Sequence, residues 1–424
     1  MLENKLVMAL VCAVLAGCSG SADDESFTVV IIPDTQNYVD YTLQKNEGFA
    51  LDSAGLFIAQ MEHVAGRAES KGGPVAFVAA VGDVWQHVLT GADTAHFARG
   101  VLPIDSNAAP HPLVRPEETR NIEIPKAIAG YQLISDAGIP FGVAPGNHDY
   151  DAWWSVAVPN GNGTGAASQE IHIGGLDAFK SAFGSDTGFF RDKDWYVSGY
   201  EGGGSSAQVF SAGGYRFLHL AFEMQAGDKV LAWAQDILNQ YPGVPTLIST
   251  HDYLNPQGER KPSVSMNLAI ADPAGNNSSE ALWQKFIRKN DQILMVFSGH
   301  QLGAATRIDD NAKGHKVYQM LSDYQARGQA ALDAGQPLGP GDRVPGVGDG
   351  WYRELNFHLS DDTPSVDVRT YSTHYESYSG ELDTYAQWYR AQEQPRMSDI
   401  EFLQADEFTL ELGDFRARFG APAL

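Results

Sequence analysis

Five short apolar stretches of this chain each stop near a polar residue of a type that binds metal ions, and this repeated pattern most limits the possible folds. Each stretch has the length and the β-branched or aromatic content of a buried strand. The five stretches are residues 27–32, 75–81, 139–144, 244–249 and 293–297, and a sixth, 215–222, ends at Glu223. The repetition predicts several strands that end in polar side chains.

Helix-like stretches separate these strands, at residues 51–70, 229–241 and 278–290. Strands that are apolar on both faces and alternate with helices are typical of an α/β fold with a covered sheet. In open α/β sheets, functional crevices lie beyond the carboxyl ends of the strands. We therefore expect the polar residues after the strands to share one site, although they are far apart in the sequence.

The composition is that of a folded, acidic protein. The chain has 424 residues, and 53 acidic side chains against 29 basic ones give a net charge of −24. Its 17 Tyr, 20 Phe and 8 Trp are ample for a hydrophobic core. A protein that holds a phosphate backbone gains affinity from Lys and Arg, so this charge argues against polynucleotide binding. Solubility in an exposed environment is the simplest reason for the acidity.

The first 18 residues resemble a bacterial lipoprotein signal. An apolar run at residues 6–15 leads into Ala16, Gly17 and Cys18, and it is too short to cross a hydrocarbon core of about 30 Å. The resemblance implies export and lipidation of Cys18, which would anchor the protein on the periplasmic or cell-surface face of a bacterial membrane. A simple signal peptide, or an uncleaved start with a chance cysteine, is the alternative. Residues 19–26 are interpreted as a tether.

The last part of the chain is less regular. Residues 326–350 contain 7 Gly and 3 Pro, which predicts a long loop that could lie over the site. Stretches at 351–359, 365–370 and 407–412 predict strands of a terminal sheet or sheet edge. We expect one main domain over residues 27–372, with residues 373–424 as a C-terminal extension packed on it.

The polar residues at the strand ends are suited to metal binding rather than to a nucleophilic triad. They are Asp34, Gln36, Asp83, Asn147, His148, Asp149, His251 and His300. Oxygen and imidazole donors without a thiolate suit Mn, Fe, Zn, Mg, Co or Ni, and a carboxylate can bridge two of these ions. So many donors predict two divalent metal ions rather than one.

In order and placement, these residues resemble the calcineurin-like metallophosphoesterases. The pattern of that family runs Asp-x-His, Gly-Asp, Gly-Asn-His-Asp/Glu, a single His and then Gly-His-x-His. The resemblance covers residues 27–325, and its most specific part is the sequence from Gly146 to Asp149. It implies a four-layer αββα sandwich with a C-terminal β-rich extension. It also implies hydrolysis of phosphate monoesters or small diesters by metal-activated water or hydroxide.

The resemblance also implies a role for each residue. Asp34 and Gln36 correspond to ligands of the first metal, and Asp83 to the carboxylate that bridges both metals. Asn147, His251 and His300 correspond to ligands of the second metal. His148 stands where the family has a histidine that contacts the phosphate or protonates the leaving group, and Asp149 where an acid orients that histidine.

Two departures from the family pattern fall on the first metal. Gln36 replaces a histidine, and Leu302 stands at the second histidine position of Gly-His-x-His. An amide oxygen can bind a hard ion, but leucine cannot. A weaker metal, a more open site, or a replacement ligand such as Gln301, Asp323 or a distant residue are the alternatives.

If the two departures prevent binding of the first metal, two other functions become the alternatives. A surface lipoprotein with a degenerate metal site would bind a ligand or partner without turnover, and a mononuclear hydrolase would use the second site alone. The histidines outside the strand-end pattern are expected to be surface or core residues, with His87 notable only because it is close to Asp83. Trp85, Tyr150, Trp153 and Trp154 are expected in the core rather than stacked on a substrate. The oligomeric state does not follow from the sequence.

Overall fold

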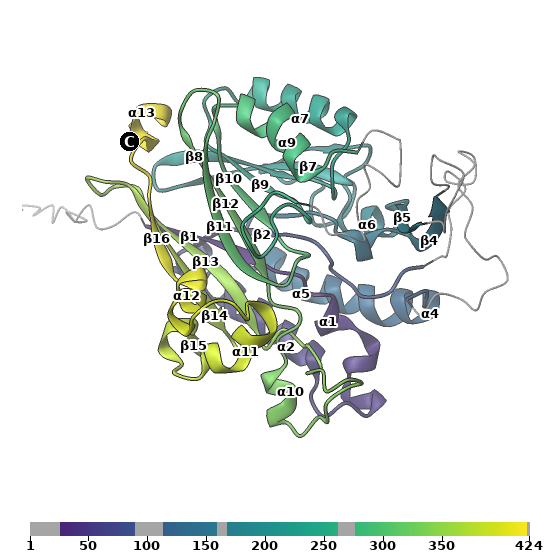
Figure 1. Cartoon of the computed structure of the whole chain (residues 1–424). Helices are drawn as coiled ribbons and strands as arrows, with labels where there is room; N and C mark the ends of the chain where they lie inside the picture. Colours follow the sequence, from purple (N-terminus) through teal and green to yellow (C-terminus); the bar gives the residue numbers. More distant parts are fainter. Residues whose placement is uncertain (1–25, 90–112, 159–167, 262–275, 422–424) are drawn as a thin grey trace, which may run out of the picture.

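A computed structural model describes residues 26–89, 113–158, 168–261 and 276–421, and these residues form four layers (Figure 1). Two seven-stranded sheets pack face to face, and helices cover the outer face of each sheet. The predicted four-layer αββα sandwich is therefore confirmed. The predicted lipoprotein signal, with Cys18, lies outside the described residues. Within the described residues, none of the helices has the length and apolar character needed to cross a membrane.

The first sheet combines strands from both ends of the chain, in the order β15-β14-β13-β1-β2-β3, with β16 paired to β14. Its strands are β1 (Phe27–Ile32), β2 (Val75–Ala80), β3 (Phe141–Val143), β13 (Trp351–His358), β14 (Ser365–Ser372), β15 (Ser377–Tyr378) and β16 (Phe408–Glu411). Strands β1, β2 and β3 are parallel, and β13 is antiparallel to β1. The expectation that residues 351–359 lie on a terminal sheet or edge is wrong, because β13 is a central strand with its first five residues buried.

The second sheet has the order β11-β12-β10-β9-β8-β7-β6. Its strands are β6 (Tyr196–Tyr200), β7 (Ser205–Ala212), β8 (Tyr215–Ala221), β9 (Thr246–Ser249), β10 (Ile293–Ser298), β11 (Gly303–Asp310) and β12 (Lys316–Asp323). Strands β8, β9, β10 and β12 run parallel, and the other three are antiparallel to their neighbours. A separate hairpin is formed by β4 (Ala152–Val158) and β5 (Ser168–Gly174).

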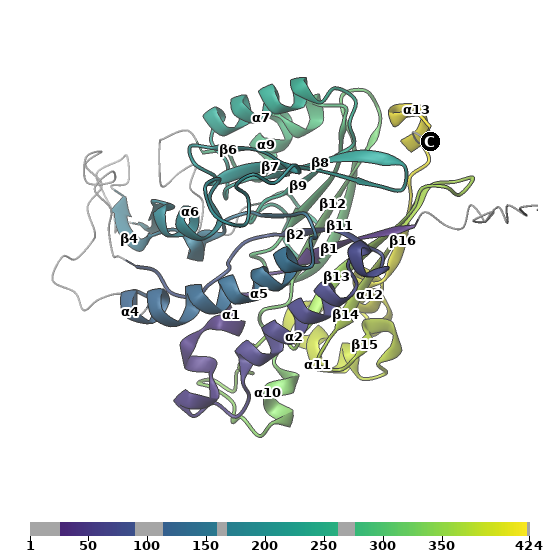
Figure 2. The same ribbon diagram turned by 180° about the vertical axis from the view of Figure 1, so that it is seen from behind.

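Helices α2 (Ser53–Gly66), α5 (Ile124–Asp136) and α6 (Asp177–Phe183) pack on the first sheet. Helices α7 (Asp228–Gln240) and α9 (Ser279–Lys285) pack on the second sheet, at the opposite side of the molecule in Figure 2. The remaining helices are α1 (Gln36–Val39), α4 (Pro116–Glu118), α10 (Gln329–Asp333), α11 (Tyr385–Glu393), α12 (Asp399–Asp406) and α13 (Phe415–Phe419).

The core between the sheets is apolar and rich in aromatic rings. The ring of Phe77 on β2 stacks on that of Phe210 on β7, with centroids 4.5 Å apart, and Phe27 on β1 stacks on Phe357 on β13 at 4.8 Å. Both rings of each pair are buried. Side chains that point away from this core from the same strands meet the outer helices, which is why the strands are apolar on both faces.

Strand β7 has no counterpart among the sequence predictions, because its polar residues hide it. Gln208 is fully buried there, donates to Ser206 Oγ at 2.8 Å and lies 2.8 Å from His219 Nδ1 of β8. Polar residues can lie inside a sheet when neighbouring strands supply their partners. A periodicity argument that counts only apolar residues misses such a strand.

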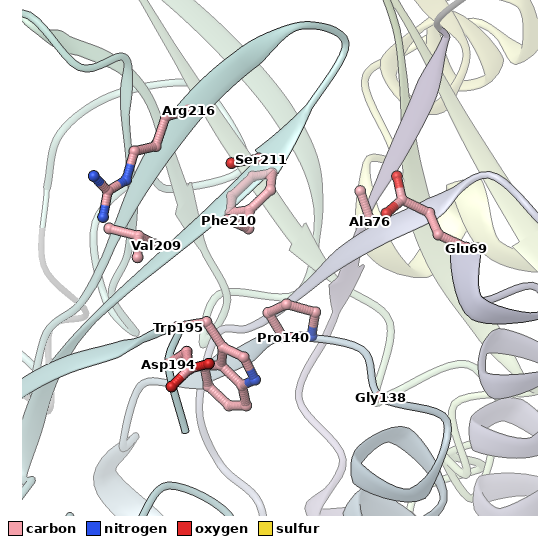
Figure 3. Close-up of a pocket in the computed structure, with 10 residues that line it drawn as sticks. All are labelled: Glu69, Ala76, Gly138, Pro140, Asp194, Trp195, Val209, Phe210, Ser211 and Arg216. Atoms are coloured by element: carbon pink, nitrogen blue, oxygen red, sulfur yellow. The ribbon is translucent and has the colours of Figure 1, made fainter. Parts of the chain in front are cut away.

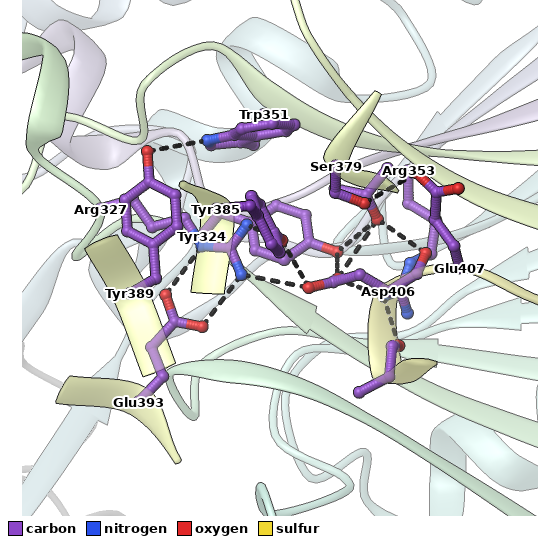
Figure 4. A network of polar contacts seen from close by, with 12 residues as sticks. Tyr324, Arg327, Trp351, Arg353, Ser379, Tyr385, Tyr389, Glu393, Asp406 and Glu407 are labelled. Atoms are coloured by element: carbon purple, nitrogen blue, oxygen red, sulfur yellow. Dashed lines mark hydrogen bonds and ion pairs between the residues drawn. The ribbon is translucent and has the colours of Figure 1, made fainter. Parts of the chain in front are cut away.

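The segment after β14 is held by a buried network of charges and rings (Figure 4). Arg327 pairs with Glu393 of α11 through two hydrogen bonds of 2.7 and 2.9 Å, and Arg353 of β13 donates to Asp406 of α12 at 2.8 Å. The guanidinium of Arg327 also lies 4.1 Å from the ring centroid of Tyr324. Two buried cations and two buried anions balance in this network, so helices α11 and α12 are fixed to the end of β12.

The glycine-rich segment 326–350 is a loop, as predicted, but it contains the short helix α10 and is pinned at Asp349. The carboxylate of Asp349 accepts from the backbone N–H groups of Gln329 and Ala330, at 2.7 and 3.1 Å. The hydroxyl of Tyr389 donates to the same carboxylate at 2.7 Å. These contacts hold both ends of the loop against α11.

Candidate metal centre

The strand-end residues predicted from the sequence meet at one edge of the molecule, where the parallel strands of both sheets end. Asp34, Asp83 and Asn147 follow β1, β2 and β3 of the first sheet, and His251 and His300 follow β9 and β10 of the second. Asp83 has φ of 50° and His300 has φ of 69°, a region that non-glycine residues rarely occupy. Such backbone strain is common at functional sites.

The imidazole of His251 lies at the centre of one group of donors. Its Nδ1 is 2.9 Å from the carbonyl oxygen of Val81, which fixes the proton on Nδ1 and turns Nε2 toward the site. The atoms around Nε2 are Asp83 Oδ1 at 3.2 Å, Asn147 Oδ1 at 3.1 Å and His300 Nδ1 at 3.1 Å.

These four atoms fit a cation better than they fit each other. A neutral His251 with its proton on Nδ1 would point the lone pair of Nε2 at two oxygen acceptors, and a protonated one has a single N–H for all three neighbouring atoms. Asp83, His251 and His300 also form one of two residue groups, within the described parts of the chain, whose ligand atoms lie close enough together to hold an ion. The donor set of one carboxylate, one amide oxygen and two imidazoles suits a borderline divalent metal.

The carboxylate of Asp83 faces two sides. Its Oδ1 belongs to the group around His251 and also accepts from the backbone N–H of His148 at 2.9 Å. Its Oδ2 accepts from Gln36 Nε2 at 3.1 Å and lies 3.9 Å from His148 Nε2. The two oxygens of this carboxylate therefore face different neighbours.

A second group of donors forms around Asp34 and Gln36, which are both buried. Asp34 Oδ2 accepts from the backbone N–H of His300 at 2.9 Å. Asp34 Oδ1 and Gln36 Oε1 have no hydrogen-bond partner among the described residues. Two buried oxygens without donors are costly unless a cation satisfies them.

Sequence reasoning did not assign Gln325 to this second group. Its amide nitrogen donates to Asp323 Oδ2 at 3.1 Å and to Asp34 Oδ2 at 3.4 Å, and its amide oxygen accepts from Gln36 Nε2. Leu302, the departure from the family pattern, and Gln301, a predicted replacement ligand, lie elsewhere. Leu302 is 38 % exposed, and Gln301 donates to Asp252 and to the Lys261 carbonyl, both at 2.8 Å.

His148 lies beside Asp83, and its orientation comes from a backbone group. Its Nδ1 is 2.5 Å from the carbonyl oxygen of Gln86, which leaves Nε2 facing the site. The carboxylate of Asp149 instead accepts from the backbone N–H groups of Val84 and Gly146, both at 2.8 Å. Asp149 therefore joins the turn after β2 to the turn after β3, and the orienting role that the resemblance implies for it stays a prediction.

Burial and charge shift the pKa of several of these acids. Burial raises the pKa of Asp34 well above its usual value, and the nearby Asp323 adds to the shift. Burial, with a smaller contribution from Asp83, raises the pKa of Asp149 to about 8. Burial would also raise the pKa of Asp83, but His251 and His148 outweigh it and hold that pKa below its usual value.

The same acidic side chains also shift the pKa of the His251 imidazole, a group that becomes cationic when it is protonated. Burial lowers the pKa of His251, but Asp83 and Asp34 outweigh burial and raise it to about 10. The site thus stabilises positive charge strongly enough to overcome the cost of desolvation. A divalent cation would benefit from the same field.

A second cluster missed by sequence reasoning lies behind His148. His87 Nδ1 is 2.7 Å from Glu123 Oε1, and the backbone N–H of His87 donates to Glu123 Oε2 at 2.9 Å. Asp40 lies in the same buried group. Glu123 closes a π-helical turn at Thr119–Glu123. The cluster fixes the loop whose Gln86 carbonyl faces His148, and His87 is buried, in line with the expectation of a surface or core histidine.

Trp85 is buried and packs against Phe179, as the core interpretation predicts. The side chains of Trp153 and Trp154 lie outside the described residues. A surface hollow of about 550 Å³ lies at the opposite edge of the sheets (Figure 3), where the parallel strands begin. Ala76 at the start of β2 and Arg216 at the start of β8 line it, so it is separate from the strand-end donors.

Comparisons with known proteins give the chain no family name, since no family model matches it. An uncharacterized protein of Bacillus subtilis (strain 168), YvnB, is 27 % identical over 246 residues, which is 57 % of this chain and 15 % of that protein. A dimetal phosphatase from Danio rerio is 12 % identical, with a TM-score of 0.37 over 82 % of this chain and 96 % of that one. The fold described above therefore rests on the strands and layers of this chain itself.

Proposed function

We propose that this protein is a metal-dependent phosphoesterase that hydrolyses phosphate monoesters or small diesters. The observation that carries the proposal is that three atoms, from Asp83, Asn147 and His300, lie within 3.1 to 3.2 Å of a fourth, His251 Nε2. The order of these residues along the chain, which resembles that of the calcineurin-like metallophosphoesterases, supports the same reaction.

The residues divide into two metal sites in this proposal. Asn147, His251, His300 and Oδ1 of Asp83 would hold one divalent ion. Asp34, Gln36 and Oδ2 of Asp83 would hold a second, since both oxygens without partners belong to this group. Bound divalent ions neutralise charge on a phosphoryl group and make a coordinated water nucleophilic near neutral pH.

In this proposal, His148 would transfer a proton to the leaving group. Because the Gln86 carbonyl accepts from Nδ1, Nε2 is the atom that gains and loses a proton. Nε2 faces Asp83 Oδ2 at 3.9 Å, so a phosphate bound by divalent ions beside Asp83 would lie within its reach. A histidine in this position would protonate the departing alcohol.

The test is hydrolysis of p-nitrophenyl phosphate and its bis-ester by the full chain, with Mn²⁺, Zn²⁺, Mg²⁺, Co²⁺ and Ni²⁺ in turn. We expect turnover that chelation removes and that Asp83→Asn and His251→Ala reduce by about 10³-fold or more. The matched control is His315→Asn, because His315 also pairs with an aspartate, at 2.7 Å, but precedes β12 at the opposite edge. Absence of turnover with every ion would contradict the proposal and favour a protein that binds a ligand without turnover.

The first 18 residues support a separate proposal, that the protein is exported and anchored through a lipid on Cys18. Cells that express the full chain should incorporate a palmitate analogue into the protein. Cys18→Ser should remove the label, while Cys12→Ser should keep it. A wild-type chain that carries no label would contradict the lipid anchor without affecting the proposed reaction.

A further inference from the structure

The hairpin of β11 and β12 places an acidic residue at the edge of the second group of donors. The two strands pair so that Gly303 lies opposite Asp323. Asp323 is buried, and it is the last residue of β12, which runs parallel to β10 and ends at the same edge. The hairpin therefore exposes Leu302 on one side and buries a carboxylate on the other.

The side chain of Gln325 connects this carboxylate to the strand end of the first sheet. It donates to Asp323 at 3.1 Å and to Asp34 at 3.4 Å, and it accepts from Gln36. Gln36 in turn donates to Asp83 Oδ2 at 3.1 Å, so a chain of contacts joins Asp323, Asp34 and Asp83, which are all buried. Among the described residues, Asp34 Oδ1 and Gln36 Oε1 are buried and have no hydrogen-bond partner.

We infer that Asp323 and Gln325 complete the first metal site, together with Asp34, Gln36 and Asp83. This inference rests on the proposed function. The set is made only of carboxylate and amide oxygens, whereas the second site has two imidazoles. An all-oxygen site selects a hard ion such as Mn²⁺ or Mg²⁺, and the imidazole site suits Zn²⁺, Fe²⁺ or Mn²⁺. The two sites therefore differ in the metal that each prefers.

Gln325 can contact the site both with and without a bound cation, because its amide carries an NH₂ donor and an oxygen acceptor. Without a cation, the NH₂ end faces two carboxylates, which is the favourable arrangement. A half-turn of this amide together with that of Gln36 exchanges nitrogen and oxygen in both. The oxygen of Gln325 then faces the side where a cation lies, and the hydrogen bond between the two amides is kept with its direction reversed. Asp323 needs no such change, since a carboxylate offers two acceptors in either state.

The test is a titration of the full chain with Mn²⁺, in which the electron paramagnetic resonance signal of free Mn²⁺ gives the number of bound ions and their affinities. We expect two ions on the wild type. Asp323→Ala and Gln325→Leu should each lower the affinity for one of the two ions by at least about tenfold. Tenfold is the lower end of the loss seen when a partner of a metal site is removed. The ion that stays bound at the imidazole site shows that these variants are folded.

Two further variants separate ligation from a structural role. Gln325→Glu should bind the ion of the first site at least as tightly as the wild type does, because a carboxylate is a better ligand than an amide. If Gln325 made only a structural hydrogen bond, Gln325→Glu would lose that bond and place a further negative charge beside Asp34 and Asp323. The affinity for this ion would then fall. Gln301→Ala should leave both ions unchanged, since that amide faces Asp252 and Lys261.

The outcomes distinguish this inference from the proposed function. Two ions with unchanged affinities in both Asp323→Ala and Gln325→Leu would overturn the assignment of these ligands and leave the phosphoesterase intact. A wild type that binds one ion would overturn it as well, in favour of a mononuclear site around His251. A wild type that binds no Mn²⁺ but hydrolyses the esters with another ion would overturn this inference and leave the phosphoesterase intact, whereas a wild type without Mn²⁺ binding and without turnover with any ion would overturn both proposals.

Discussion

Gly146 lies against the carboxylate of Asp83 so closely that a Cβ at position 146 would be 2.2 Å from Asp83 Oδ1. No real Cβ approaches an oxygen to that distance, so an alanine must displace the carboxylate or the turn after β3. Glycine is required here by the close approach and not by its backbone angle, since φ of Gly146 is −96°. The conformation of the turn and the position of the carboxylate are therefore set together.

We predict that Gly146→Ala lowers metal affinity at the site by at least about tenfold, because a displaced ligand loses its geometry. Metal titration measures the effect. Gly66→Ala is the matched control, because Gly66 ends helix α2 with open space around it. That change should leave metal binding unaltered and stabilise the protein by about 0.5–1 kcal/mol. Equal metal affinity in Gly146→Ala and the wild type would contradict the role of Asp83 as a ligand.

The role of His148 predicts a dependence on the leaving group. If Nε2 protonates the departing oxygen, His148→Asn should slow the hydrolysis of phenyl phosphate by about 10²–10⁴-fold. It should slow p-nitrophenyl phosphate much less, because nitrophenolate leaves without a proton. Measurement of kcat for both esters gives the comparison. Equal losses for the two esters would mean that His148 binds the phosphate instead of donating a proton.

The buried pair of Arg327 and Glu393 predicts a large loss of stability when its cation is removed. Arg327→Met leaves Glu393 and Asp406 buried without that partner, and breaking such pairs costs about 3–5 kcal/mol. Urea denaturation should show this loss in the free energy of unfolding. Arg390→Met, on the same side of the fold, removes an exposed ion pair with Asp399 and should cost no more than about 1 kcal/mol. A loss in Arg327→Met that is as small as the loss expected for Arg390→Met would show that the network in Figure 4 adds little stability.

His219 predicts how stability depends on pH. It is fully buried between Gln208 and Ser249, and burial lowers its pKa from 6.5 to about 3. The unfolded chain therefore binds a proton that the folded chain does not, and stability falls as the pH decreases through 6.5 toward 3. The slope from this one group reaches about 1.4 kcal/mol per pH unit.

The measurement is the free energy of unfolding of the wild type and of His219→Gln at several values between pH 7 and pH 4. The variant lacks the titrating group, so its stability should fall less steeply on acidification by about the slope given above. The comparison of slopes removes any constant loss from altered packing. Parallel pH profiles would show that His219 does not contribute to acid sensitivity.

Much of the fold could be predicted from the sequence because its strands and turns are decided locally. Residues 27–32 form a strand as predicted, and so do residues 244–249 over most of their length. Their apolar side chains face two covering layers, and the polar residues stand shortly after the strand ends, where the chain leaves the sheet. Asp34, Asp83, Asn147, His251 and His300 were found for this reason, and the structure brings them to one edge.

Only the tertiary structure decided what each of these side chains meets. Gln325 contacts Gln36 across 289 positions of the chain, and Asp149 accepts from the backbone N–H of Val84 across 65 positions. Such contacts depend on how two sheets are packed and on the register of a hairpin, as where Gly303 lies opposite Asp323. Strand ends follow from short-range sterics and burial, whereas partners within the site follow from the packing of segments that are distant in sequence. The sequence by itself therefore determined the candidate ligands, and the packing of the two sheets determined how they group.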